Sequence, residues 1–215
     1  RDPEMSRGLG DVYKRQFMGG PATGKGTRSD ILANHLNIPH ISTGDMLREA
    51  SKKNKEIAEK LSKGMLISDD EITAMLKDRI HEEDCKEGFI LDGYPRTLKQ
   101  VHALDSMLKE VGKKVDMVFE LVVEDELAFR RILERRKCEK CGRAYGIDFP
   151  PKVENVCDDC GGNLVIRTDD TRETLKARIE TYRENSKEIL DYYKNEGLLK
   201  TIDASSHPER VINDI

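Results

Sequence analysis

The chain has 215 residues, of which 37% are hydrophobic and 36% are charged. That length allows one or two domains whose core needs no disulfide bonds. No apolar run approaches the ~20 residues of a membrane-spanning helix, which excludes an integral membrane protein. The net charge of −4 argues against a protein whose main task is to coat nucleic acid.

The first sixteen residues show no apolar periodicity and contain an internal Met5. We interpret residues 1–16 as a non-native or disordered leader and leave them out of the predicted fold. Lys14, Arg15 and Gln16 stand where a buried first strand is expected, directly before Phe17. Because a central strand of this composition would bury charge at high cost, we expect a destabilised protein.

Strands and helices alternate along the rest of the chain, which predicts a parallel sheet with helices on both faces. The predicted elements are a helix at 27–36, a helix opened by the capping box Ser68–Glu71, a buried strand at 89–91, a helix at 97–111, a strand at 115–123, a helix at 124–136, a long helix at 170–196 stopped by Gly197, and a strand at 198–202.

A glycine-rich turn fits the phosphate-binding pattern G-x-x-x-x-G-K through Gly19, Gly24 and Lys25. Backbone N–H groups of such a turn, with the N-terminus of the following helix, surround a phosphate, and the lysine reaches the β- and γ-phosphates. A glycine-rich turn with a chance lysine is the alternative. The helix directly after the turn argues against that alternative, whereas the short apolar stretch before it argues in its favour.

Asp92 ends the apolar run 89–91. In P-loop proteins a carboxylate in this position holds Mg²⁺, often through water. Aspartate commonly ends strands, so the phosphate loop is what gives this residue its predicted role.

Cys138, Cys141, Cys157 and Cys160 form two C-x-x-C pairs in a glycine-rich segment. This spacing predicts a closed tetrahedral zinc site with a structural role. Two unrelated pairs or redox pairs are the alternative. The fifth cysteine, Cys85, is interpreted as an inert thiol.

Arginines recur near turns and beside the cysteine segment, and phosphoryl transfer between two nucleotides needs this kind of charge neutralisation. The candidates are Arg48, Arg96, Arg131, Arg135, Arg167 and Arg178.

Three motifs together closely resemble the adenylate kinase family. They are the phosphate loop 20–27, the stretch Ile-Ser-Thr-Gly-Asp-Met-Leu-Arg at 41–48, and Asp-Gly-Tyr-Pro-Arg-Thr at 92–97. The zinc cysteines, Tyr145 and the Pro150–Pro151 step resemble the long form with a metal-bearing lid. The resemblance runs from about Phe17 to the end of the chain.

The resemblance implies a P-loop three-layer α/β/α fold with a parallel central sheet and two insertions. The core domain would comprise residues 17–42, 72–134 and 171–215, the helical AMP-binding insertion 43–71, and the zinc-binding lid 135–170.

The resemblance also implies roles for residues that match the family motifs. The ATP-binding residues would be Ala22, Thr23, Gly24, Lys25, Gly26, Thr27, Arg135, Ala144, Tyr145 and Ser206. The AMP-binding residues would be Thr43, Arg48, Met65, Leu66, Ile67, Gly93, Tyr94, Pro95, Arg96, Gln100, Arg167 and Arg178. The catalytic residues would be Lys25, Asp92, Arg96, Arg131, Arg135, Arg167 and Arg178, and Asp169 and Asp170 would pair with lid arginines.

The implied reaction is ATP + AMP to 2 ADP with Mg²⁺, and Zn²⁺ would stiffen the lid. Gln100 favours AMP, because the related pyrimidine nucleotide kinases usually carry Asn there and a short lid. We expect a cytoplasmic monomer whose partners are ATP, AMP and ADP, with no nucleic acid and no membrane.

Three features depart from the family pattern. Ala22–Thr23 replace the usual Gly-Ala, which would strain the loop if Ala22 needs a positive φ. The insertion at 51–64 is shorter than in many relatives, and the first strand is polar. Three alternatives stay open: a zinc-ribbon binding module, a pyrimidine nucleoside monophosphate kinase, and an inactive copy.

Overall fold

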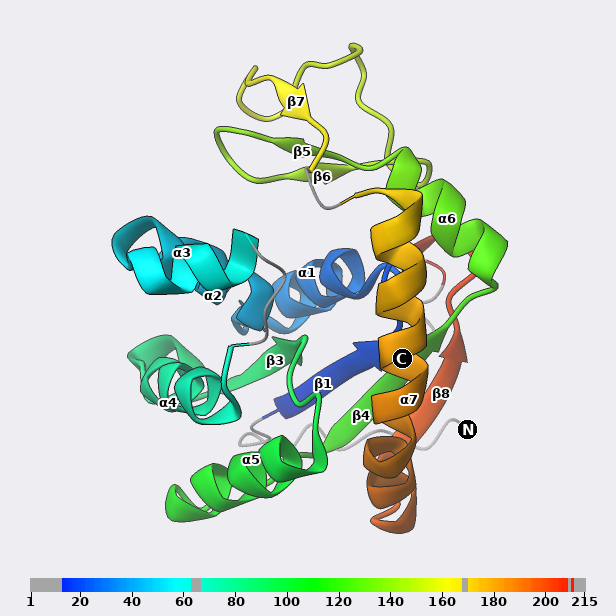
Figure 1. Ribbon diagram of the computed structural model, residues 1–215. Helices are drawn as coiled ribbons and strands as arrows, with labels where there is room; N and C mark the ends of the chain where they lie inside the picture. Colours follow the sequence, from blue (N-terminus) through cyan, green and yellow to red (C-terminus); the bar gives the residue numbers. More distant parts are fainter. Residues whose placement is uncertain (1–12, 63–66, 168–169, 209, 211–215) are drawn as a thin grey trace, which may run out of the picture.

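A central parallel sheet organises the computed structural model, which describes residues 13–62, 67–167, 170–208 and 210 (Figure 1). Within these residues the sheet has five strands in the order β2-β3-β1-β4-β8. All four neighbouring pairs are parallel. The strands are β1 (Tyr13–Gly19), β2 (His40–Ser42), β3 (Gly88–Asp92), β4 (Met117–Val122) and β8 (Leu199–Asp203).

Helices cover both faces of this sheet, as the sequence predicts. On one face α1 (Lys25–Leu36) packs Leu32 against apolar side chains of β1, β4 and β8. On the other face α4 (Asp69–Ile80), α5 (Leu98–Glu110) and α7 (Arg172–Asn195) enclose a second apolar cluster. The predicted three-layer α/β/α fold is confirmed.

Two smaller units project from the carboxyl edge of the sheet (Figure 1). The first holds α2 (Thr43–Lys53) and α3 (Lys55–Ser62). The second is an antiparallel sheet in the order β6-β5-β7, formed by β5 (Arg136–Cys138), β6 (Ala144–Tyr145) and β7 (Leu164–Val165). This small sheet follows α6 (Asp125–Leu133) and precedes α7. A short 3₁₀ helix, η1 (Glu83–Cys85), lies between α4 and β3 in the chain.

Most predicted elements match the structure to within a few residues, and the predicted capping box of Ser68 and Glu71 is present. The predicted helix over 124–136 is too long, because α6 ends at Leu133 and Arg136 pairs with Tyr145 in the small sheet. Among the described residues, no helix combines the length and the apolar character that a membrane span requires.

The first strand, β1, begins at Tyr13, so residues 13–16, which the predicted fold leaves out, belong to the sheet. Residues 13–16 pair with β3 on one side, and Arg15 and Gln16 pair with β4 on the other. This backbone pairing holds the polar segment in the centre of the sheet.

The polar side chains of β1 find partial compensation. Lys14 is buried, with its ammonium 3.7 Å from a carboxylate oxygen of Asp116. Gln16 accepts a hydrogen bond of 3.1 Å from the hydroxyl of Tyr193, whereas its buried Nε2 has no partner among the described residues. Burying this incompletely bonded amide carries a desolvation cost in β1.

Candidate active site

The loop between β1 and α1 has the backbone of an anion-binding turn. Gly19 and Gly24 take positive φ angles of 143° and 80°, and a Cβ on Gly19 would meet the Leu121 carbonyl oxygen at 2.5 Å. Gly24 caps α1 without a side-chain hydrogen bond, and the first turn of α1 carries no acidic residue. The backbone N–H groups of this turn are therefore available to a phosphate.

Lys25 is the first residue of α1, and its side chain points back across this loop. Its Nζ donates to the carbonyl oxygens of Gly19 at 2.9 Å and Gly20 at 2.8 Å. Burial lowers the pKa of Lys25 to about 8, with Asp92 opposing the shift and neighbouring arginines adding to it. A bound phosphate would supply the anion that this ammonium needs.

Arginines from three different segments act on Lys25, and a fourth, Arg48, acts on one of them. Arg96, Arg135 and Arg178 each act electrostatically on Lys25, and Arg48 and Arg178 act on Arg96. Burial lowers the pKa of Arg96, and the neighbouring Arg178 lowers it further. Such mutual repulsion is typical of a site built for a polyanion.

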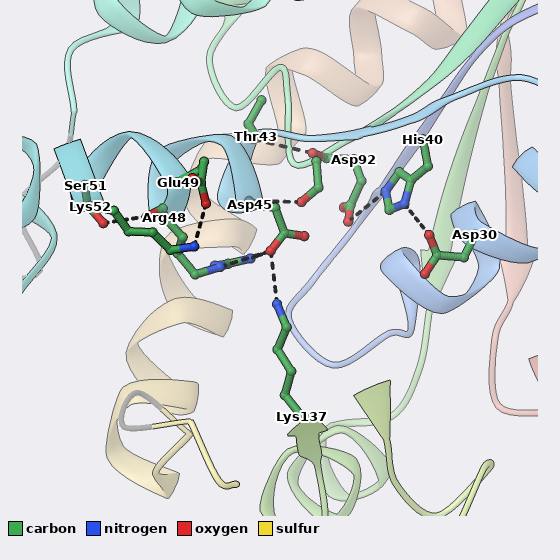
Figure 2. A network of polar contacts seen from close by, with 11 residues as sticks. Asp30, His40, Thr43, Asp45, Arg48, Glu49, Ser51, Lys52, Asp92 and Lys137 are labelled. Atoms are coloured by element: carbon green, nitrogen blue, oxygen red, sulfur yellow. Dashed lines mark hydrogen bonds and ion pairs between the residues drawn. The ribbon is translucent and has the colours of Figure 1, made fainter. Parts of the chain in front are cut away.

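Asp92 lies at the carboxyl end of β3, facing this positive cluster. Burial opposes its ionisation, but His40 and Lys25 keep the pKa of Asp92 below its usual value. His40 places Nε2 3.7 Å from Asp92 Oδ2 and Nδ1 2.7 Å from Asp30 Oδ1 (Figure 2). Although burial lowers the pKa of His40, its two carboxylate partners outweigh burial and raise it to about 9. Asp92 is thus an ionised carboxylate beside the loop, which suits hydrated Mg²⁺.

Two of the residues predicted to bind AMP, Thr43 and Gln100, form hydrogen bonds with the segment 92–96 at the carboxyl end of β3. Thr43 is buried, and its hydroxyl donates to the Asp92 carbonyl oxygen at 3.4 Å. Gln100 is also buried: its side-chain oxygen accepts from the Arg96 N–H at 2.6 Å, and its amide donates to Asp69 at 2.6 Å. Gln100 therefore fixes the backbone of Arg96 in this state.

The remaining predicted AMP contacts lie in different environments. Tyr94 is buried and donates to the Gln100 carbonyl oxygen at 3.2 Å, so its side chain supports the turn from inside. Gly93 has a φ of 82°, and a Cβ there would lie 2.9 Å from the Thr43 hydroxyl oxygen. Ile67 is buried. Two further predicted AMP contacts, Met65 and Leu66, lie outside the described residues, as does Asp169, which was predicted to pair with a lid arginine.

Two arginines that precede the small sheet of the lid form ion pairs and hydrogen bonds with other residues of the protein. Arg135 forms a two-pronged ion pair with Asp170, as predicted for that aspartate. Arg131 donates to the Ala204 carbonyl oxygen at 2.8 Å, and its Nε lies 3.2 Å from a carboxylate oxygen of Asp148. Arg167 follows β7, where the lid returns to α7.

Four cysteines meet at one end of the lid. The sulfur atoms of Cys138, Cys141, Cys157 and Cys160 all lie within 4.8 Å of one another. Four thiolates at 2.3 Å from a tetrahedral ion are spaced on the order of 4 Å apart, so this donor set fits Zn²⁺. The Tyr145 hydroxyl donates to Cys157 Sγ at 3.3 Å, which directs this predicted ATP contact toward the cysteines.

Cys85 lies away from this cluster and matches the predicted inert thiol. It is fully buried, and burial raises its pKa to about 11. A thiol with this pKa is almost entirely protonated at neutral pH.

Three polar residues of the site carried no sequence signal of their own. Arg28 and His40 have their partners in distant segments, and Asp148 lies in the loop after β6. The position of Arg28 one helical turn after Lys25 was the available hint, because it puts both side chains on the same end of α1.

The fold and the site define a P-loop phosphotransferase. The family model described as adenylate kinase matches residues 17–198. A curated adenylate kinase of Archaeoglobus fulgidus is 44% identical over 204 residues, covering 93% of this chain and 94% of that protein. The adenylate kinase of Caldicellulosiruptor bescii is 46% identical over 188 residues, covering 85% and 87% of the two chains. The chain belongs to the adenylate kinase family and is a nucleoside monophosphate kinase.

Proposed function

We propose that this protein catalyses the reversible transfer of the γ-phosphoryl group of ATP to AMP, giving two ADP. The observation that carries the proposal is the gathering of Lys25, Arg96 and Arg178 around the phosphate loop, opposite Asp92. In this transfer the bond from the γ-phosphorus to the β,γ-bridging oxygen breaks, and an AMP phosphate oxygen forms the new bond. No covalent enzyme intermediate is needed.

The residues of the site act by position and charge. In this proposal the loop N–H groups and Lys25 bind the ATP phosphates, Arg48 and Arg96 bind the AMP phosphate, and Arg178 and Arg167 stabilise the transferring group. Preorganised cations stabilise the charge that spreads over the equatorial oxygens in the transition state. Closure of the lid and the helical insertion would exclude water, which otherwise competes for the γ-phosphoryl group.

Two metals have fitting donors in this chain. Asp92 would hold Mg²⁺ through water, and the ion neutralises charge on the β- and γ-phosphates when bound. Cys138, Cys141, Cys157 and Cys160 would hold Zn²⁺ with no open position, so its role is to fold the lid. We further propose a cytoplasmic monomer whose partners are ATP, AMP and ADP.

A pyrimidine nucleoside monophosphate kinase is the second candidate. Gln100 is the residue predicted to contact the base of the acceptor nucleotide. Its side chain is hydrogen-bonded to Arg96 and Asp69, so it would have to exchange one of these bonds for a bond to the base. By resemblance a glutamine in this position favours adenine, and the four-cysteine lid supports the same choice.

The test is a coupled assay of ADP formation from ATP and Mg²⁺ with AMP, CMP or UMP as acceptor. We expect turnover that depends on AMP and is reduced at least about a hundredfold in Lys25→Ala, as for loss of a preorganised cation. Lys187→Ala, at an exposed site of α7, is the matched control. Absence of turnover with every acceptor, in folded and zinc-loaded protein, would overturn the proposal.

A further inference from the structure

Arg28 is a fully buried cation in the first helix, with a relative exposure of 0%. Arginine is almost never buried to this extent without an anionic partner. Here the described hydrogen bonds of the guanidinium all go to backbone carbonyl oxygens. Burial, together with the nearby Arg131, lowers the pKa of Arg28 to about 10, and Asp148 opposes this shift. The hydrogen bonds of this guanidinium therefore have to compensate for its desolvation.

The acceptors of Arg28 belong to two loops far apart in the sequence. Nη1 donates to the Thr23 carbonyl oxygen at 2.9 Å, in the phosphate loop. Nη2 donates to the carbonyl oxygens of Ala204 at 2.9 Å and Ser206 at 3.0 Å, in the loop after β8. The guanidinium also lies directly under Gly24, where a Cβ would meet Nη1 at 2.1 Å. Arg28 is therefore a bridge between these loops.

The sheet explains why one side chain reaches both loops. Gly19 of β1 pairs with Leu121 of β4, and Leu121 pairs with Ile202 of β8. The carboxyl ends of β1 and β8 thus lie level, two strand spacings or about 10 Å apart. The loops that follow them face the same edge, and α1 returns beneath both.

A second guanidinium also donates to the loop after β8. Arg131 of α6 donates to the same Ala204 carbonyl oxygen at 2.8 Å and to that of Ser205 at 3.4 Å. Residues 204–206 are therefore fixed by two cations, one from the phosphate-loop helix and one from the helix that leads to the lid. The carbonyl oxygens of residues 204–206 already accept hydrogen bonds from these two arginines. The loop therefore offers a ligand a fixed surface.

We propose that Arg28 is a positioning residue for the ATP site, which holds the 204–206 loop at a fixed distance from the phosphate loop so that one nucleotide spans both. This inference rests on the proposed function, in which the triphosphate lies on the phosphate loop and the base lies against Ser206. The phosphate end is fixed by the loop itself and by Lys25. Arg28 therefore contributes mainly at the base end of the nucleotide. Its loss should weaken binding of ATP more than binding of a polyphosphate that has no base.

The experiment compares calorimetric binding of ATP and of inorganic tripolyphosphate, each with Mg²⁺, to the full chain and to Arg28→Met. We expect ATP binding to weaken about tenfold in the variant and tripolyphosphate binding to change less than about twofold. The phosphate loop loses one bond, at Thr23, and keeps Lys25 and its own backbone N–H groups, whereas the 204–206 loop loses both of its bonds to Arg28. Arg183→Met, at an exposed arginine of α7, is the matched control and should leave both affinities unchanged.

Arg28→Lys is the second variant. It keeps the charge in a compact ammonium that cannot bond to both loops, so we expect the same loss of ATP preference, and it serves if the methionine variant does not fold. Equal losses of ATP and tripolyphosphate binding in a folded variant, or unchanged ATP binding, would overturn the proposal. So would a wild-type protein with no preference for ATP over tripolyphosphate. A wild-type protein with that preference but no AMP-dependent turnover would overturn the proposed reaction alone.

Discussion

Lys137 of the lid places its ammonium 3.2 Å from Asp45 Oδ1 in the helical insertion (Figure 2). The same oxygen accepts a hydrogen bond of 2.6 Å from Arg48 Nη2. Asp45 thus links the lid to the arginine proposed to bind the AMP phosphate. Burial opposes ionisation of this carboxyl, but Arg48 and Lys137 outweigh burial and lower its pKa to about 2.

Removing the lid side of this link, with Lys137→Met, should loosen the contact between the lid and the insertion. The pKa of Asp45 should rise toward its ordinary value, which an NMR titration of its carboxyl carbon measures. Because exposed ion pairs contribute up to about 1 kcal/mol, we expect the KM for AMP to rise no more than about fivefold.

Lys140→Met is the matched control, since Lys140 is an exposed lysine of the same lid. It should leave the Asp45 titration and the KM for AMP unchanged. If Lys137→Met leaves the pKa of Asp45 where it is, the ion pair does not form in solution.

Local sequence patterns predicted the parts of this site that depend on near neighbours. The phosphate loop follows from three residues within a single turn, Asp92 follows from the apolar run before it, and the two C-x-x-C pairs follow from metal-ligand spacing. The strands and helices of the core follow from apolar periodicity. Each of these signals lies within a short stretch of chain, so it can be read without knowledge of the tertiary fold.

Contacts between distant segments were out of reach of the same reasoning. Lys137 and Asp45 are 92 positions apart, and Arg28 and Ser206 are 178 positions apart. Both pairs exist because the sheet order and the lid bring loops together, and a single sequence carries no periodicity that reports this. The polar start of β1 was missed for the related reason that backbone pairing outweighed side-chain composition.

Ala22 carries the strain that the sequence predicted for the phosphate loop, since its φ is 60°. A residue with a Cβ pays roughly 1–2 kcal/mol for this left-handed conformation, whereas glycine adopts it freely. We expect Ala22→Gly to stabilise the protein by about 1 kcal/mol in urea unfolding, after the entropy cost of the glycine.

The same substitution at Ala50, within α2, is the control of opposite sign. There it should destabilise by about 0.5–1 kcal/mol, because glycine is unfavourable inside a helix. A loss of stability in both variants would show that the loop conformation costs Ala22 nothing.

The thiols of this protein should react in two classes. With zinc bound, we expect no rapid reaction with a disulfide reagent; after chelation the four lid cysteines should react quickly, and Cys85 only on unfolding. Cys160→Ser should lower the bound zinc, whereas Cys85→Ser should leave it unchanged and remove only the slow thiol. Rapid reaction of four thiols before chelation, in protein that contains zinc, would contradict the assigned ligands.

Lys14 gives the stability of the protein a particular pH dependence. Burial lowers the pKa of Lys14 in the folded state, and Asp116 only partly offsets the shift. The unfolded chain therefore binds this proton more firmly, and the folded state gains stability as pH rises through the folded pKa toward the ordinary value near 10.4. Below the folded pKa the penalty is fully present.

Lys14→Met removes the buried charge and keeps the backbone hydrogen bond of 2.7 Å from residue 14 to Asp116. The burial cost of the Lys14 ammonium is only partly offset by Asp116, and the Asp116 carboxylate stays partly exposed to water without it, so we expect the variant to be more stable by about 1 kcal/mol at pH 7. Urea unfolding of both proteins at pH 7 and pH 10 should show this advantage shrinking at the higher pH. Lys187→Met, at an exposed position, should give no difference at either pH. An advantage that stays constant with pH would mean that the methionine stabilises by packing alone and that Lys14 carries no charge penalty in β1.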